Sequence, residues 1–375
     1  SAGKKDEKGD RVYMLKGPSI PEIGKTPSAV SRPEEAIKRH KNSTLSRKPT
    51  DRYIVRPDDR LDLAVRKILA LHLGRLREQL PGIRQDIDTE SIHQARVATR
   101  RMRSSIRLFR DAIPDGARKS ILKELKWLAG LLGPVRDLDV FLLNISSFKG
   151  LRHLKGKEKG FFANWIEEHR RTPLAALIHS LDSPRFRRFE LCITRFLEGP
   201  LPDNPEAALA GKQVNEVAPT LLNEKLEAVI GQGGKVIAEP RMKEFHRLRI
   251  RVKRLRYACE FISPAYDGAL KPFIRRTVEL QDCLGEMQDT VFTREFIDFL
   301  FDDWKSRVVS PSLLFALGEI YQLQDKIADD RQRDFGRIWG RFTSDKTVER
   351  LKEVLSLPPN NGKDRESGRK GVKNI

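Results

Sequence analysis

The chain carries one pattern of cationic residues twice, and both copies have helical spacing. His93 is followed by basic residues three, seven, eight and ten positions later, and His246 is followed by basic residues at the same four positions. Residues three, four and seven positions apart lie on one face of an α-helix, so each copy gathers its charges along one strip. A strip of one sign repels itself unless something negative lies on it. The pattern therefore predicts two helices that face an anion.

The region between the two ends of the chain is expected to be entirely helical. Apolar residues recur at three- and four-residue steps, for example from Leu61 to Leu80 and from Leu313 to Leu323. Alternating apolar and polar runs bounded by hairpin turns, the pattern of strands, do not stand out. The sequence predicts an all-α fold.

The helical region divides into two halves that resemble each other. Leu128–Asp137 has a counterpart in Leu280–Asp289, and each segment follows its basic strip at nearly the same distance. We predict two duplicated four-helix bundles, related by a pseudo-two-fold axis, with a central basic groove or pore. The expected segments are a flexible basic arm at 1–50, a first bundle at 51–197, a linker at 198–212, a second bundle at 213–356 and a flexible basic tail at 357–375.

Further helices are expected on both sides of each basic strip. Amphipathic helices should precede the strips at about 57–80 and 214–231, and others should follow at about 161–197 and 291–341. Gly133-Pro134 is expected to stop a helix, with the next aspartate capping a new one.

A helical wheel separates the first strip from the side that faces the core. Arg101 stands apart from the strip, close to Val97 and Leu108. Repulsion between these like-charged neighbours destabilises the helix by about 1–2 kcal/mol, and no acidic residue in the segment offsets that repulsion. A solvated face is the plain alternative, but such faces alternate in sign, whereas arginines hold phosphates bidentately. The residues that share an arc of about 100° are His93, Arg96, Arg100, Arg103, Arg107 and Arg110.

The second strip is less uniform than the first. Glu260 falls on its arc, and Glu244 lies just before it in sequence. A second basic flank is formed by Arg247, Arg251 and Arg254. We therefore expect residues 93–110 to hold an anion more strongly.

The histidines and a pair of aspartates have catalytic and metal-binding alternatives. His93 and His246 could ligate a metal or accept a phosphoryl group, but arginines oppose a cation and no ligand set has the required spacing. We favour contact with an oxyanion or a neighbouring helix. Asp137 and Asp139 could hold Mg²⁺, but Asp289, the counterpart of Asp137, has no carboxylate two residues later. Structural roles are favoured, as a helix cap or in ion pairs with inward-facing arginines, and we expect no metal and no cofactor.

Composition restricts the partners and the compartment. Lys and Arg number 72 against 52 Asp and Glu, a formal charge of +20, which predicts a polyanionic partner such as nucleic acid, an anionic membrane surface or polyphosphate. The 7% aromatic content argues mildly against stacking of single-stranded bases. Cys192, Cys259 and Cys283 lie in helical segments and suit buried thiols in a reducing compartment. With neither a signal peptide nor an apolar membrane span evident, we expect a cytoplasmic protein.

The two strips resemble the signature helices of the CHAD family, which is named for its histidine-bearing α-helical domain. His93 through Phe109 is similar to the first signature, and His246 through Phe261 is similar to the second. Leu132–Val140 resembles the end of that family's second helix. The resemblance covers about residues 55–345.

The resemblance implies two related four-helix bundles with a basic groove or pore that binds inorganic polyphosphate. On its basis we expect a non-enzymatic protein, recruited to polyphosphate granules, whose oligomeric state is left open. The alternatives are a nucleic-acid-binding helical protein and a histidine-dependent phosphohydrolase or phosphotransfer enzyme. Carried over by position, the residues lining the site would be His93, Arg96, Arg100, Arg101, Arg103, His246, Arg249, Lys253, Arg254 and Arg256, with Arg107, Lys119, Lys123, Lys271 and Arg275 as further contacts.

Overall fold

The structure is a computed structural model that describes residues 51–147, 154–200 and 207–356. Within these ranges every regular element is a helix, and strand-like pairing is confined to one isolated bridge between Arg60 and Gln213. The predicted all-α fold is confirmed. The expected arm at 1–50 and tail at 357–375 lie outside the described residues.

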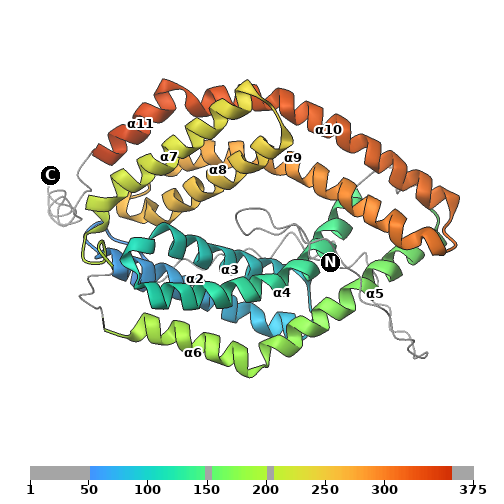
Figure 1. The fold of residues 1–375 in the computed structure, drawn as a ribbon, viewed down its shortest axis with the longest axis horizontal. Helices are drawn as coiled ribbons and strands as arrows, with labels where there is room; N and C mark the ends of the chain where they lie inside the picture. Colours follow the sequence, from blue (N-terminus) through green and yellow to red (C-terminus); the bar gives the residue numbers. More distant parts are fainter. Residues whose placement is uncertain (1–50, 148–153, 201–206, 357–375) are drawn as a thin grey trace, which may run out of the picture.

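Each half of the described chain contains five α-helices, not the four that we expected (Figure 1). The first half contains α2 (Leu61–Arg84), α3 (Thr89–Leu108), α4 (Asp115–Ser147), α5 (Gly156–Leu181) and α6 (Pro184–Glu198). The second half contains α7 (Val214–Ala238), α8 (Met242–Ile262), α9 (Lys271–Asp303), α10 (Pro311–Thr343) and α11 (Asp345–Ser356). In each half a pair of helices is followed by a longer helix, and the last helix is the shortest. The predicted duplication and the pseudo-two-fold relation stay predictions.

The predicted helix stop at Gly133-Pro134 is wrong, because α4 continues through it. An internal proline costs a helix about 3 kcal/mol. Val135, Leu138 and Phe141 follow it on one face and are fully buried, and each such burial contributes about 1.5–3 kcal/mol. Tertiary packing therefore outweighs the local signal. Helix α9 likewise passes through Gly285.

The helices break at other places than the sequence suggested. The expected helix at 161–197 is two helices, because Ser183 caps α6 by accepting a hydrogen bond from the Phe186 amide and Pro184 occupies the first helical turn. The expected helix at 291–341 is also wrong: α9 runs on to Asp303, and α10 begins only at Pro311.

The two halves share a continuous apolar core. Buried residues of α2, α3 and α4 form one cluster with buried residues of α7, α8 and α9, and His72 of α2 lies edge-on to Phe261 of α8 at 6.1 Å between ring centroids. Figure 1 shows α3 and α8 adjoining in the middle of the molecule, where the halves meet.

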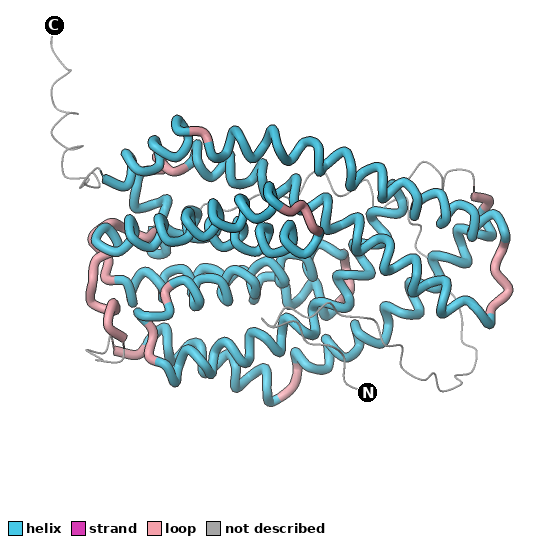
Figure 2. The backbone as a smooth tube through the Cα atoms, turned by 45° about the horizontal axis from the view of Figure 1, so that its top comes forward, coloured by secondary structure: helices cyan, strands magenta, loops and turns pink. Residues whose placement is uncertain are grey.

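A second apolar cluster joins the halves at the far ends of their longest helices. Phe141 of α4 lies 3.6 Å from Phe296 of α9 between ring centroids, and Trp165 of α5 packs edge-on against Trp304 at 5.9 Å. The indole nitrogen of Trp165 also donates to Asp303 at 2.8 Å. Figure 1 shows α5 running toward the end of the molecule where α9 and α10 meet, and Figure 2 shows the same end, on the right, as helices joined by a loop. The halves are therefore braced at two separate places.

A buried ion-pair network fixes α5 against α4 and the end of α2. Arg170 donates to Asp139 at 2.9 Å and reaches both carboxylate oxygens of Asp86 at 2.7 Å. The Asp139 side chain is only 1% exposed, and Asp86 has a positive φ of 46° just after α2 ends. This network confirms the expected inward pairing of Asp139.

The described part of the predicted linker lies against the start of α2. The Leu61 amide donates to the Lys212 carbonyl at 2.8 Å, and the Val214 amide donates to the Asp59 carbonyl at 3.0 Å.

No helix in the described ranges is long and apolar enough to cross a bilayer. Cys259 and Cys283 are buried as expected, whereas Cys192 is only half-buried.

Replacing Gly233 with alanine is expected to destabilise the protein by about 1–3 kcal/mol. A Cβ at this position of α7 would overlap the ring of Trp339, which is held between Phe335 and Phe342. Gly234→Ala is the matched control, since a Cβ there meets nothing within 4 Å, and it should stabilise the helix by about 0.5–1 kcal/mol. Urea unfolding of the three proteins measures both effects. Equal stabilities for the two variants would contradict this packing.

Candidate anion-binding site

Helices α3 and α8 pack against each other where the two halves meet. Asp88 caps the start of α3 by accepting a hydrogen bond from the Ser91 amide at 2.8 Å. The predicted core face of α3 is confirmed: Ala95, Met102 and Ile106 are fully buried. Because these apolar residues of α3 face the core, the basic residues of α3 and α8 lie at and around the contact between the two helices.

Four cations from the two strips influence one another across this contact. The ammonium of Lys253 is half-buried, and desolvation lowers its pKa to about 7, with the charges of Arg249 and Arg100 acting in the same direction. Burial also lowers the pKa of Arg249, again reinforced by Arg100. Arg96 contributes to the repulsion at Lys253. The structure thus brings Arg96 and Arg100 of α3 close to Arg249 and Lys253 of α8.

Helices α4 and α9 supply one carboxylate to each side of this group. Arg96 pairs with Asp137 of α4 at 3.4 Å, which confirms the expected ion pair. Asp289 of α9 plays the same part for Arg249: its negative charge raises the pKa of Arg249, whereas burial lowers that pKa. The repeat in sequence therefore recurs in space, since each basic helix has an arginine next to an aspartate on the following helix.

The two histidines stand at equivalent positions but have different neighbours. Desolvation and the nearby guanidinium of Arg136 lower the pKa of His93, which favours the neutral ring. His246 Nδ1 lies 2.6 Å from the side-chain oxygen of Gln288 on α9. A group of three or more potential metal ligands does not occur in the ranges that the structure describes.

The strips come into direct contact around one tyrosine. The ring of Tyr257 is 4% exposed, and the guanidinium groups of Arg100, Arg101 and Arg256 lie 5.9, 5.4 and 5.6 Å from its centroid. Such distances allow cation–π attraction, which offsets part of the repulsion between the arginines. Glu260 lies 2.6 Å from Arg101 and 2.8 Å from Arg256. The helical wheel placed Arg101 off the strip. The structure shows that Arg101 of α3 forms an ion pair with Glu260 of α8, in the other half.

The remaining expected site residues differ in their exposure and ion pairs. Arg103 is half-buried on α3, and Lys119 pairs with Asp115 at 2.9 Å near the start of α4, about 25 Å along the helix from Arg136. Their role in binding stays a prediction. The exposed residues of the expected set are Arg107, Lys119, Lys123, Arg254, Lys271 and Arg275.

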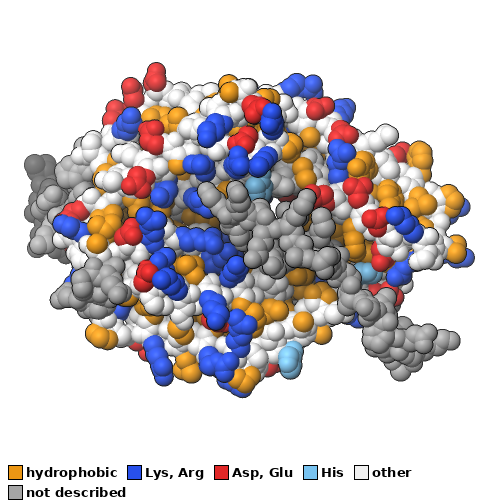
Figure 3. Space-filling view, in the orientation of Figure 1, with side chains coloured by type: hydrophobic (Ala, Val, Ile, Leu, Met, Phe, Trp, Pro, Cys, Tyr) orange, Lys and Arg blue, Asp and Glu red, His pale blue; other side chains and the backbone are white. Residues whose placement is uncertain are grey.

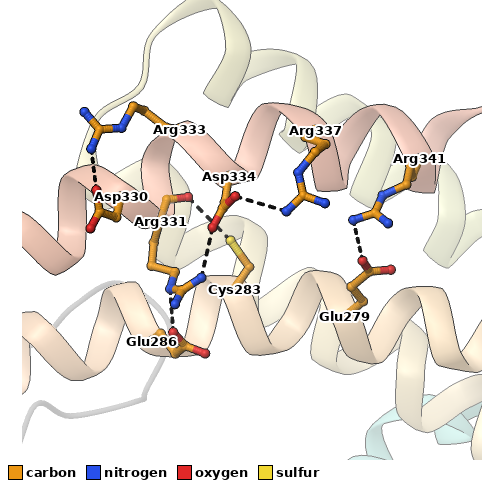
Figure 4. A network of polar contacts seen from close by, with 9 residues as sticks. All are labelled: Glu279, Cys283, Glu286, Asp330, Arg331, Arg333, Asp334, Arg337 and Arg341. Carbon is orange, nitrogen blue, oxygen red and sulfur yellow. Dashed lines mark hydrogen bonds and ion pairs between the residues drawn. The ribbon is translucent and has the colours of Figure 1, made fainter.

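Where α10 lies beside α9, the arginines of α10 are paired with neighbouring carboxylates (Figure 4). Arg337 pairs with Asp334 at 3.0 Å three residues earlier, and Arg341 pairs with Glu279 of α9 at 2.7 Å. These signs alternate along the helix, as on an ordinary solvated face. The first strip has no such acidic residues in its own segment.

The surface between the halves is where cations gather. Figure 3 shows Lys and Arg side chains on both sides of a hollow between the lower and upper halves.

Two cavities lie elsewhere. A cavity of about 210 Å³ lies between α7 and α8 and is lined by Gln232, Lys235 and Arg251. Another, of about 150 Å³, lies beside α11. The second basic flank predicted for α8 thus turns toward α7 at Arg251.

Sequence reasoning missed several members of this site. Arg136, Gln288 and Asp289 lie in the repeated segment that we interpreted as a helix end, so their contact with the strips went unrecognised. The recurrence of this segment at nearly the same distance after each histidine was the available signal. Glu260 falls on the arc of the second strip, but the helical wheel does not reveal that Glu260 and Tyr257 lie at the contact with the first strip.

Comparisons with known proteins agree with the all-helical fold. A family model described as the CHAD domain matches residues 67–298, from α2 into α9. The crystal structure of the CHAD domain from the plant Ricinus communis is similar, with a TM-score of 0.54 and 20% identity over 81% of this chain and 95% of that chain. PptA from Streptomyces chartreusis is similar with a TM-score of 0.57 and 15% identity, over 75% and 99% of the two chains. At these identities the likeness concerns the fold. No curated protein matches the sequence.

Proposed function

This chain belongs to the CHAD domain family, and on that premise we propose that it binds inorganic polyphosphate without transforming it. The basic strips of α3 and α8 would hold the polymer between the halves. A linear chain of phosphates offers one negative charge after another, which suits two neighbouring rows of cations. In the cell, this binding would place the protein in the cytoplasm on polyphosphate granules.

The observation that carries the proposal is the concentration of like charge where α3 meets α8. The charges of Arg249, Arg100 and Arg96 help to lower the pKa of Lys253, and the charge of Arg100 helps to lower that of Arg249. The aspartates nearby offset only part of this charge. A bound polyanion would remove this repulsion and release its own counterions, and both effects favour binding. Arginine is also the side chain that grips phosphate oxygens bidentately.

Two alternatives fit the site less well. Base readout in a major groove uses Asn and Gln as well as Arg, whereas the strips offer chiefly guanidinium groups. In a histidine-dependent phosphoryl transfer the nucleophile of His246 would be Nε2, since Nδ1 is engaged by Gln288, but the sequence has no Gly-rich phosphate-binding loop to accompany either histidine. Loss of phosphate release in a His93→Ala variant, if the wild type released phosphate from the polymer, would establish the enzyme instead.

Competition at several salt concentrations tests the proposal. Fluorescently labelled long-chain polyphosphate should bind, and its affinity should fall as salt rises, with a slope of about 0.7 in log–log form for each phosphate contact. Duplex DNA, RNA and ATP serve as competitors at equal phosphate concentration, and we expect them to compete weakly. Equal competition by duplex DNA would show a general polyanion binder and contradict specific recognition of polyphosphate.

Polyphosphate affinity is expected to fall as the pH rises above 7. The pKa of Lys253 is about 7 in the free protein, and a bound polyanion favours the charged ammonium, so the pKa must be higher in the complex. The contribution of Lys253 is therefore complete below pH 7 and is lost as the pH rises toward the bound pKa. A total loss of about tenfold, from well below pH 7 to pH 9, corresponds to a rise of about one pKa unit. Lys253→Arg, which stays charged, should flatten the profile, and an equally steep profile in that variant would assign the effect to another group.

A further inference from the structure

The repeat reverses its charge at one position of the two basic helices. Fourteen residues after His93 the first copy has Arg107, whereas fourteen residues after His246 the second copy has Glu260. Arg107 is exposed, but the Glu260 side chain is only 19% exposed and lies at the contact between α3 and α8. A carboxylate thus stands inside the cationic surface.

The Glu260 carboxylate is held by one guanidinium from each half. Its Oε1 accepts a hydrogen bond from Arg256 Nε at 2.8 Å, and its Oε2 lies 2.6 Å from Arg101 Nη2. Arg100 is the third guanidinium around the same Tyr257 ring. The ring forms an apolar floor beneath these groups, where an ion pair is screened less than in open water.

These surroundings would also suit a phosphate group. Guanidinium groups bind carboxylates and phosphates through the same pair of parallel hydrogen bonds. The hold on Glu260 is incomplete, because its buried Oε2 has no aligned hydrogen-bond donor despite the nearby charge of Arg101. The carboxylate therefore occupies an anion subsite without satisfying it fully.

We propose that Glu260 is an internal competitor of the polyanion, occupying a phosphate subsite formed by Arg101 and Arg256 above the Tyr257 ring. This inference rests on the proposed function. In the free protein the carboxylate neutralises part of the surface and keeps the two strips together. A polyphosphate anchored at Arg96 and Arg249 must displace it to extend over the subsite, so Glu260 lowers the affinity and the number of phosphates contacted.

Glu260→Gln tests the proposal, because it removes the charge and keeps the shape and a hydrogen-bond acceptor. The affinity for long-chain polyphosphate should rise about tenfold, the equivalent of one charge-assisted contact. The salt dependence should steepen by about 0.7 for each guanidinium that gains a phosphate. Glu260→Asp retains the charge and is the control, with affinity and salt slope close to those of the wild type.

A purely structural role of Glu260 predicts a different result. If the carboxylate only braces the halves, Glu260→Gln lowers the melting temperature and leaves the affinity and salt slope unchanged or reduced, which would overturn the proposal. Should the glutamine variant fail to fold, Glu260→Met, which fills the same volume without charge, is measured against the same expectations. If neither wild type nor variant binds polyphosphate, the proposed function fails and this inference with it. Binding by the wild type with no gain in the variant rejects the inference alone.

Discussion

Replacing Arg170 with methionine is expected to lower the free energy of unfolding by about 3–5 kcal/mol. Arg170 donates to Asp139 and to both oxygens of Asp86, and desolvation of the network is outweighed by these bonds, which raise the arginine pKa. Without the guanidinium, the Asp139 carboxylate would remain buried and lose its hydrogen-bonded partner, with only the charge of Arg136 nearby. Chemical denaturation at neutral pH measures the loss.

The neighbouring residue supplies the control for this prediction. The Arg171 side chain is 73% exposed, so Arg171→Met should change the stability by no more than about 0.5 kcal/mol. Asp139→Asn combined with Arg170→Met removes the stranded charge and should recover part of the loss. An Arg170 variant as stable as the Arg171 variant would show that the network contributes nothing to folding.

Polyphosphate affinity is expected to fall about 100- to 1,000-fold when Arg96, Arg100 and Arg249 are replaced together by alanine. Each guanidinium would lose a charge-assisted contact of about 1.5–3 kcal/mol, and the three losses fall short of full additivity because the residues are neighbours. The variant should remain folded, because like-charge repulsion is removed even as Asp137 loses its partner. Binding to labelled long-chain polyphosphate at fixed salt measures the effect.

A control with the same change of net charge separates the site from the overall charge of +20. Arg187, Arg188 and Arg195 are exposed on α6, away from the contact between α3 and α8. Replacing all three by alanine should reduce the affinity less than threefold. Equal losses in the two triple variants would mean that any basic surface of this protein holds the polymer, and that the strips have no special role.

The sequence was sufficient for the fold class and for the cations that meet at the centre. Helical spacing alone separated Ala95, Met102 and Ile106 from Arg96 and Arg100, and the structure buries the first set and brings the second next to Arg249. The periodicity of apolar and charged residues is a property of each helix by itself, so it can be recognised in a single sequence.

Contacts between helices could not be read in the same way. Pro134 carries a strong local stop signal, and only the burial of the residues after it keeps α4 intact. Arg101 lies off the strip on a wheel, yet its long side chain reaches Glu260 across the contact. The helix ends at Ser183 and Asp303 likewise depend on packing and capping that periodicity does not record.

The two separate braces between the halves have a kinetic consequence. Because the halves are joined at α3 and α8 and again by the aromatic cluster around Phe296, the cationic surface is already assembled before a ligand arrives. Encounter with a polyanion then needs no domain closure, and the field of the surface steers it, so association should be fast and slow markedly as salt rises. The residence time of the bound polyanion would be set by the number of phosphate contacts that must break at the same time.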